Sequence, residues 1–180
     1  MKSDLITPGI GTAAFFESVL SPARFNFFML TKLPAAWFSG LKVIAANEHQ
    51  CSVSVPFRWF TQNPFGSTYF ACLSMAAEMS TGILAQAHIY KKQPAISMLI
   101  ISSEGRYFKK AKGKTIFTCM DGAAINDAIR LSIETGAGQT INVKSSGYNK
   151  DGELIAEFFF TWSFKQKSHY MPPASGARAV

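Results

Sequence analysis

The sequence is poor in charged residues, in acidic residues above all, and in cysteine. Only 16% of its 180 residues are charged, and 18 Lys and Arg against 11 Asp and Glu give a formal net charge of +7. The three cysteines are an odd number without the spacing of metal ligands. A disulfide scaffold and a zinc finger are therefore excluded, and a reducing compartment is favoured.

Long apolar runs are also missing. No purely apolar stretch reaches eighteen residues, so we predict no transmembrane span and no stable membrane insertion. The first residues are not followed by the apolar segment of a signal peptide, and we expect a cytoplasmic protein. The hydrophobic fraction of 48% is normal for a globular protein, and this length suits one domain with its own core.

The motifs of several large functional classes are absent. We find no nucleic-acid-binding motif, so the positive charge is not assigned to a nucleic-acid partner. A Walker loop and a Gly-x-Ser-x-Gly elbow are missing as well. His49, His88 and His169 have no ligand spacing with cysteine or carboxylate. We therefore predict no metal site and no bound cofactor.

The pattern of apolar residues predicts an α+β fold, with an antiparallel β-sheet wrapped around a long central helix. Short helices are expected over 12–20, 22–33 and 34–38, the long helix over 67–90, and an inserted helix over 121–136 with Ala124, Ala128, Ile129 and Leu131 facing inward. Strands are expected over 41–49, 51–57, 95–108, 114–120, 139–148 and 153–165. The domain organisation predicted is a helical extension (1–40), a main domain (41–168) and a flexible tail (169–180).

The extension is rich in phenylalanine, which has two explanations. The side chains of Phe15, Phe16, Phe25, Phe27 and Phe28 can pack against the main domain or anchor the chain on a membrane surface. Packing is favoured, because few basic residues accompany them and an interfacial helix is usually rich in Lys and Arg.

Glu78 is the first candidate for chemistry. It is the one charged residue between Arg58 and Lys91, and it lies in a helix that is apolar or small on all sides. Burying a carboxylate without a partner is expensive and raises its pKa, so such a group is a candidate for catalysis. The alternative is that Glu78 only accepts hydrogen bonds from neighbours.

The start of the same helix is the second candidate. The first-turn N–H groups from Ser67 to Phe70 have no intrahelical partners and can stabilise a developing oxyanion. Asn63 can orient a water molecule or a substrate carbonyl. The alternative is that Ser67 caps the helix and Asn63 stabilises the turn that ends at Gly66.

The run from Asn63 to Gly82 resembles the central motif of the hot-dog fold acyl-CoA thioesterases, most of all the phenylacetyl-CoA type. That motif has Asn, then Gly three residues on, a His-Gly pair at six and seven, and Asp or Glu at fifteen. Asn63, Gly66 and Glu78 match at this spacing, and the segment 149–162 is similar to the last hairpin of that family. The departures are Tyr69 in place of His and Phe70 in place of Gly.

The resemblance implies a homodimer or a dimer of dimers that binds an acyl-CoA or acyl-carrier thioester between two subunits. Glu78 would be general base or nucleophile, acting across the interface. The N–H of Phe70 would polarise the carbonyl, Asn63 would position water or substrate, and Gly66, Tyr69 and Ser97 would help to place the substrate. Coenzyme A would enter only as part of the substrate.

Four lysines, Lys109, Lys110, Lys112 and Lys114, form either a solvated turn or a contact for coenzyme A phosphates. A thioester hydrolase is the first hypothesis for function. A non-catalytic protein that binds or senses acyl groups is the alternative, favoured by the departures at Tyr69 and Phe70. Dehydratase chemistry is disfavoured, because none of the histidines falls near the motif.

Overall fold

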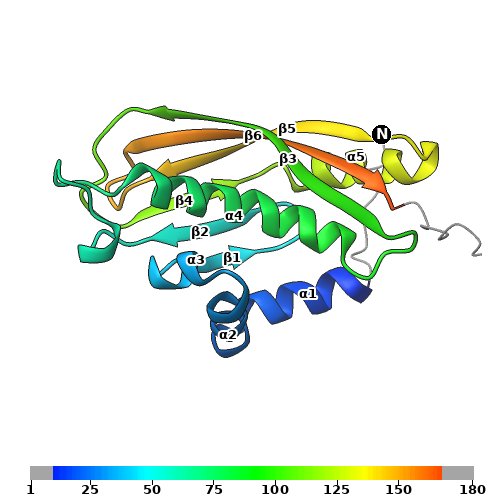
Figure 1. Ribbon diagram of the computed structural model, residues 1–180, viewed down its shortest axis with the longest axis horizontal. Coiled ribbons are helices and arrows are strands. Elements are labelled where there is room, and N and C mark those ends of the chain that lie inside the picture. The colour runs from blue at the N-terminus through cyan, green and yellow to red at the C-terminus, as the bar shows by residue number, and fades with distance from the viewer. Residues whose placement is uncertain (1–9, 168–180) are drawn as a thin grey trace, which may run out of the picture.

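A computed structural model describes residues 10–167, which form one curved sheet around one long helix (Figure 1). The helices are α1 (Ile10–Leu20), α2 (Pro22–Lys32), α3 (Pro34–Phe38), α4 (Phe70–Ile89) and α5 (Gly122–Thr135), with a short 3-10 turn at Trp59–Thr61. The strands are β1 (Lys42–Ala46), β2 (Cys51–Val55), β3 (Ile96–Tyr107), β4 (Thr115–Cys119), β5 (Gln139–Tyr148) and β6 (Leu154–Gln166).

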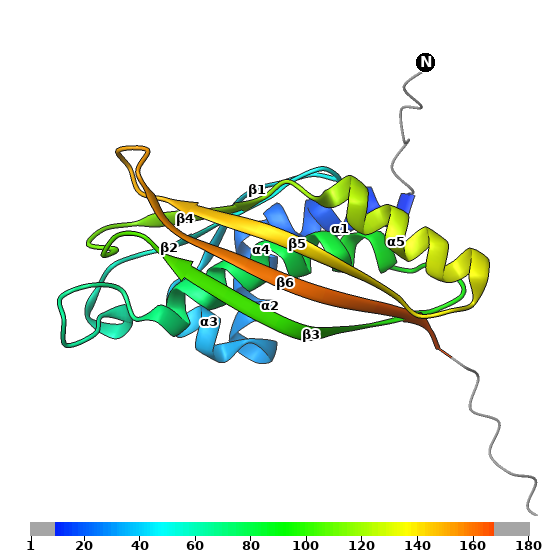
Figure 2. The same cartoon turned by 90° about the horizontal axis from the view of Figure 1, so that it is seen from above.

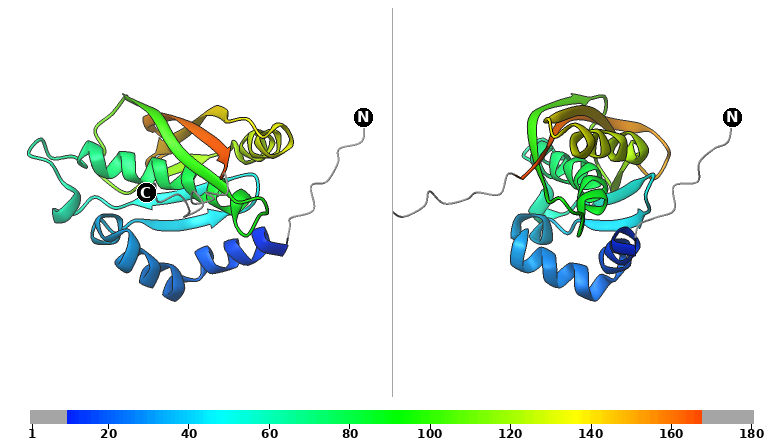
Figure 3. Two further views of the ribbon diagram at one scale, coloured as in Figure 1. Left: turned by 45° about the vertical axis from the view of Figure 1, so that its right-hand side comes forward. Right: turned by 90° about the vertical axis from the view of Figure 1, so that its right-hand side faces the viewer.

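The six strands pair antiparallel in the order β1-β2-β4-β5-β6-β3. Figure 2 shows the sheet crossing over α4, and the end-on view of Figure 3 shows it curling around this helix. Twelve residues of α4 are buried, among them Leu73, Ala76 and Leu84. The prediction of an antiparallel sheet around a central helix is confirmed.

Strand β3 forms one edge of the sheet. It follows α4 in sequence yet pairs with β6 over its whole length, and its other side pairs with no strand of residues 10–167. The residues between β3 and β4 therefore do not form a hairpin turn but cross the molecule from one sheet position to another. This crossing carries the four lysines to the same end of the molecule as the loop that precedes α4 (Figure 2).

The three N-terminal helices lie beside β1 and α4, along the lower side of Figure 1. Thr12 donates a hydrogen bond from Oγ1 to the Ala87 carbonyl of α4 (3.3 Å), and so ties α1 to the central helix. Gly40 ends α3 with φ at +71°, and a Cβ there would collide with the Arg58 guanidinium. Phe16 belongs to the core and Phe15 and Phe25 pack against it as expected, whereas Phe27 and Phe28 are exposed.

Two helices differ from the prediction. Helix α4 begins at Phe70 instead of Ser67, because residues 67–69 are extended and hydrogen-bonded to other loops. In α5 the buried face is Ile125, Ile129 and Ser132, whereas Ala124 and Leu131 are exposed. The predicted tail, 169–180, lies outside the described residues. Among the helices of 10–167, none is long and apolar enough to cross a membrane.

Candidate functional site

The first turn of α4 offers unpaired backbone donors, but fewer than the sequence predicts. Of the four N–H groups from Ser67 to Phe70, three are engaged: Ser67 with the Asn63 side chain, Thr68 with the Ala111 carbonyl and Tyr69 with the Thr61 carbonyl. Within residues 10–167, the N–H of Phe70 donates to no acceptor. The positive end of the α4 dipole is therefore open at Phe70.

Asn63 organises the loop before the helix. Its Oδ1 accepts the N–H groups of Phe65 (3.0 Å) and Ser67 (3.2 Å), and its Nδ2 donates to Ser67 Oγ (3.1 Å). The N–H of Gly66 donates to the Asn63 carbonyl, and Gly66 takes a positive φ of +69° that closes this turn. These contacts are the ones expected if Asn63 stabilises a turn, which was the alternative to a role in orienting water or substrate. The other half of that alternative is wrong, since the N-cap position of α4 is Tyr69 and not Ser67, and the Tyr69 side chain makes no capping hydrogen bond.

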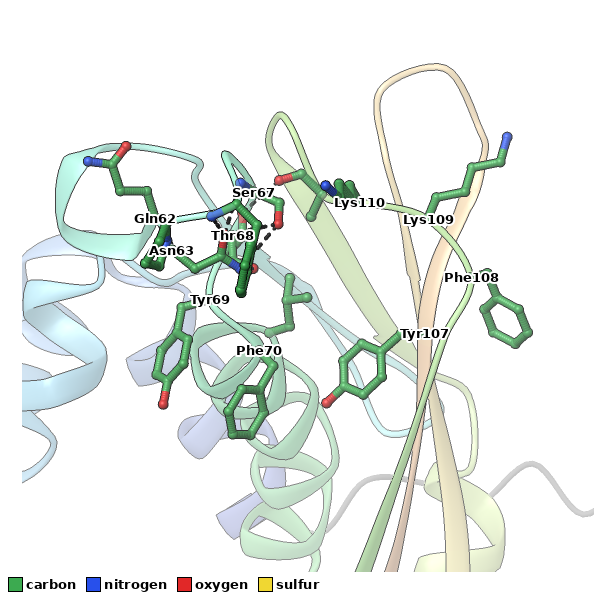
Figure 4. A pocket seen from close by; sticks show the side chains of 14 residues that line it. Gln62, Asn63, Ser67, Thr68, Tyr69, Phe70, Tyr107, Phe108, Lys109 and Lys110 are labelled. Carbon is green, nitrogen blue, oxygen red and sulfur yellow. Dashed lines mark hydrogen bonds between the residues drawn. The ribbon is translucent and has the colours of Figure 1, made fainter.

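An open hollow of about 810 Å³, here called the helix-start hollow, lies over this end of α4. Its lining comes from the loop 62–70, from Leu73 and from the crossing segment 107–111. In Figure 4 the rings of Phe70 and Tyr107 both lie below the loop that carries Ser67 and Thr68, while the Lys109 side chain points away from both rings. Tyr69 and Phe70 are 46% and 55% exposed, so both departures from the thioesterase motif face this hollow.

Glu78 lies two turns further along α4 and lines a different space. This second space, here called the Glu78 cavity, has a volume of about 510 Å³. Helices α1 and α2 form one side of it, and α4, β3 and β6 form the other. The Glu78 carboxyl group has no hydrogen bond or ion pair with the described residues, and its burial raises its pKa above the ordinary value.

The residues around Glu78 fix the position of its backbone. Thr81 Oγ1 donates to the Glu78 carbonyl (2.9 Å) and accepts the indole N–H of Trp162 (3.0 Å). Gly82 faces the cavity, and a Cβ at this position would lie 3.0 Å from Glu78 Oε1. The sheet therefore holds the helix segment that carries the carboxyl group, while Gly82 leaves the carboxyl group room.

One chain does not bring all of the predicted residues together. Asn63, Tyr69 and Phe70 line the helix-start hollow, and Gly66 shapes the loop beside it, whereas Glu78 lines the other cavity. Ser97 is exposed and lines neither space; its neighbour Met98 points into the Glu78 cavity instead. The role predicted for Ser97 stays a prediction.

The site also contains residues that sequence reasoning did not single out. Tyr107 places its ring at the helix-start hollow, where partial burial raises the pKa of its hydroxyl. Arg24 lines the Glu78 cavity from α2, which brings a cation to the space that holds the buried acid. No local motif marks either residue, because both lie on segments that are distant in sequence from the motif and meet it only in the folded chain.

The histidines that the structure describes do not reach this site. His88 is buried, its Nε2 lies 3.1 Å from the Glu48 carbonyl, and desolvation lowers its pKa. His49 lies at the surface beside Glu48. Within residues 10–167, no three side chains of His, Cys, Asp or Glu are grouped as metal ligands.

Comparisons with solved structures show what this architecture is similar to. A Pseudomonas aeruginosa protein described as a probable thioesterase matches 81% of this chain and 97% of its own, with 18% identity and a TM-score of 0.68. A thioesterase from Haemophilus influenzae matches 82% of this chain and 93% of its own (13% identity, TM-score 0.56). The PaaI protein of the E. coli phenylacetic acid degradation operon matches 86% and 96% (10% identity, TM-score 0.57).

These structural similarities, at low sequence identity, establish the fold. A sequence search of curated proteins finds no match. The family model described as "Domain of unknown function (DUF4442)" matches residues 22–164, which include the main domain and most of the helical extension. The chain therefore has the hot-dog fold, and it belongs to the DUF4442 family.

Proposed function

We propose that this protein hydrolyses acyl thioesters, with Glu78 as the general base. The observation that carries the proposal is the Glu78 carboxyl group, which lies in an apolar cavity without a described hydrogen bond or ion pair. A structural acid would be expected to have partners that offset its desolvation. An acid that must accept a proton from water at near-neutral pH benefits instead from a raised pKa.

The chemistry follows from these groups. The Glu78 carboxylate removes a proton from water as the water oxygen attacks the thioester carbonyl carbon. The carbonyl oxygen gains negative charge, which the free N–H of Phe70 and the α4 dipole stabilise. The intermediate then expels the thiolate, which takes the proton from Glu78. The products are a carboxylic acid and a thiol, and Glu78 is again ionised.

In this proposal the chain forms a homodimer, and each site combines Glu78 of one subunit with the Phe70 N–H of the other. Within a chain they line separate spaces, so one molecule alone does not supply both to one carbonyl. Strand β3 offers the edge for pairing: it is twelve residues long and its outer side is unpaired within residues 10–167. Leu99 and Ile101 on β3 are 64% and 54% exposed. An exposed edge offers unpaired N–H and C=O groups as a template for pairing with another strand.

The lysines support an anionic carrier for the acyl group. Lys109 and Lys110 lie at the helix-start hollow, where the crossing segment passes the start of α4. The charge of Lys110 would attract the phosphates of coenzyme A or of an acyl-carrier prosthetic group, whereas the Lys109 ammonium group is already paired with the Glu153 carboxylate. Asn63 would act as a positioning residue, because it holds the loop that leaves the Phe70 N–H open.

A second candidate function is non-catalytic binding of acyl thioesters. The observation that favours it is the Phe70 ring, which lies at the helix-start hollow where the thioesterase motif has glycine. A bulky side chain beside the oxyanion donor restricts the approach of a carbonyl group. Binding without turnover would follow if no carbonyl reaches the Phe70 N–H.

The experiment that tests the proposal is thioester hydrolysis by the purified chain and by its Glu78→Gln variant over short, long and aryl acyl-CoAs. Gln keeps the size of the side chain and removes the base. We expect kcat to fall by about a hundredfold or more, the usual range for a lost general base.

The matched control is Glu17→Gln, which makes the same change at an exposed position on α1. This variant should hydrolyse thioesters at the wild-type rate. If wild type and Glu78→Gln both hydrolyse thioesters only at the uncatalysed rate and still bind acyl-CoA, the hydrolase proposal is contradicted and the binding function is supported.

A further inference from the structure

We infer that the Glu78 cavity is the acyl-chain site, and that the N-terminal helices set the length of the acyl group that it takes. The inference rests on the proposed function, which places the thioester carbonyl beside Glu78. The part of the substrate beyond that carbonyl must then continue into the space around Glu78. That space is walled by α1 and α2 and not by the hot-dog sheet alone.

The chemistry of the wall fits a hydrocarbon chain. Phenylalanines from α1 and α2 (Phe15, Phe25 and Phe28) face aliphatic and sulfur-containing side chains of α4 and β3 (Met79, Ile83 and Met98) across it. Glu78 and Arg24 are the charged members of the lining. A ligand that fills such a space needs one polar end near Glu78 and an apolar body, which describes an acyl group with its carbonyl.

The side of the Glu78 cavity formed by α1 and α2 is fixed against the core, and a site that selects for acyl length needs such a fixed boundary. Phe16 and Val19 of α1 and Met29 of α2 are buried in the core, and the Phe15 ring contacts the Tyr90 ring at a centroid distance of 5.2 Å. At the floor, Gly82 interrupts α4 without a side chain, although glycine inside a helix is destabilising by about 1 kcal/mol relative to alanine. The space that Gly82 leaves beside the Glu78 carboxyl group explains why glycine is found at this position.

Ser18 is the position at which to test the inference. It is half-buried on α1 and lines the cavity, so Ser18→Phe would fill part of the space from the extension without touching α4. We expect kcat/KM for long acyl-CoAs to fall by about tenfold or more, since about two buried methylene groups are worth that much. Hydrolysis of acetyl-CoA should be unchanged. Ala13→Phe, an equal enlargement at an exposed position of α1, should leave the whole series unchanged.

A second variant covers the case in which Ser18→Phe does not fold. Phe28 lines the cavity and is 47% exposed, so Phe28→Ala removes part of the wall at its solvent side. This variant should move the preferred acyl length upward. Thermal unfolding of each variant shows whether it is folded.

The outcomes separate this inference from the proposed function. If Glu78→Gln abolishes hydrolysis but Ser18→Phe and Phe28→Ala leave the chain-length profile unchanged, the proposed hydrolase function is supported. The assignment of the Glu78 cavity as the acyl-chain site is then wrong. If no thioester is hydrolysed, binding is measured with dodecanoyl-CoA and acetyl-CoA. If Ser18→Phe binds dodecanoyl-CoA more weakly than wild type but binds acetyl-CoA equally well, the acyl-chain site is supported without the activity. If wild type and Ser18→Phe bind dodecanoyl-CoA equally well, the inference is overturned.

Discussion

At Glu78 one carboxyl group lies in a cavity that residues of five different elements line. Desolvation raises its pKa, and the other charged group in the lining of its cavity is Arg24. For an acid whose pKa is higher in the folded than in the unfolded state, the folded state binds more protons over the interval between the two values. The free energy of unfolding therefore decreases as the pH rises through the folded pKa.

This linkage predicts the effect of Glu78→Gln on stability. Gln carries no charge, so the variant should be more stable than wild type above the folded pKa. The difference should vanish below pH 4.5, the ordinary value for glutamate. We expect the melting temperature to rise by a few degrees at pH 8, since one kcal/mol corresponds to about 2–4 °C in a chain of this length. A difference that does not change with pH, or a lower melting temperature at pH 8, would contradict the account.

The start of α4 is the element on which the proposed oxyanion site depends. Tyr69 has the extended backbone (φ −62°, ψ 135°) that is compatible with a following proline, and Phe70 is the first helical residue. Proline is well tolerated at that position because its missing N–H has no intrahelical partner. Phe70→Pro therefore removes the donor while it leaves the helix in place.

We expect Phe70→Pro to reduce kcat by about a hundredfold to a thousandfold, the range for one lost oxyanion donor. Phe70→Ala keeps the N–H and removes the ring, and it should retain or increase kcat. Steady-state kinetics with the same acyl-CoA check both variants. A loss in Phe70→Ala as large as that in Phe70→Pro would show that the ring matters and the N–H does not.

The same helix shows what sequence reasoning reaches and what it misses. Its length, its enclosure and the isolation of Glu78 follow from the residue pattern. Its starting residue does not, because Thr68 and Tyr69 are held extended by the carbonyls of Ala111 and Thr61, which are tertiary contacts. The family resemblance implies that Glu78 acts across a subunit interface, and a single chain does place Asn63 and Glu78 in two separate spaces.

At the scale of the whole molecule, the proposed dimer depends on the outer edge of β3. Ile101 is exposed on this edge, and Ile101→Asp would introduce a charge where two strands are to meet. We expect the variant to be a monomer by light scattering and to lose hydrolysis with it. Leu131→Asp places the same charge at an exposed leucine of α5 and should remain dimeric and active. A dimeric, active Ile101→Asp would place the interface elsewhere.

The central claim is that each site takes Glu78 from one subunit and the Phe70 N–H from the other, and a mixing experiment tests it directly. Glu78→Gln and Phe70→Pro, each inactive alone, are unfolded together and refolded as a mixture. A mixed dimer then contains one site with both groups intact, and random pairing should restore about a quarter of the wild-type activity. If both groups act from the same chain, no mixed dimer contains an intact site. A mixture as inactive as its components, with mixed dimers demonstrated by mass spectrometry, would contradict the account.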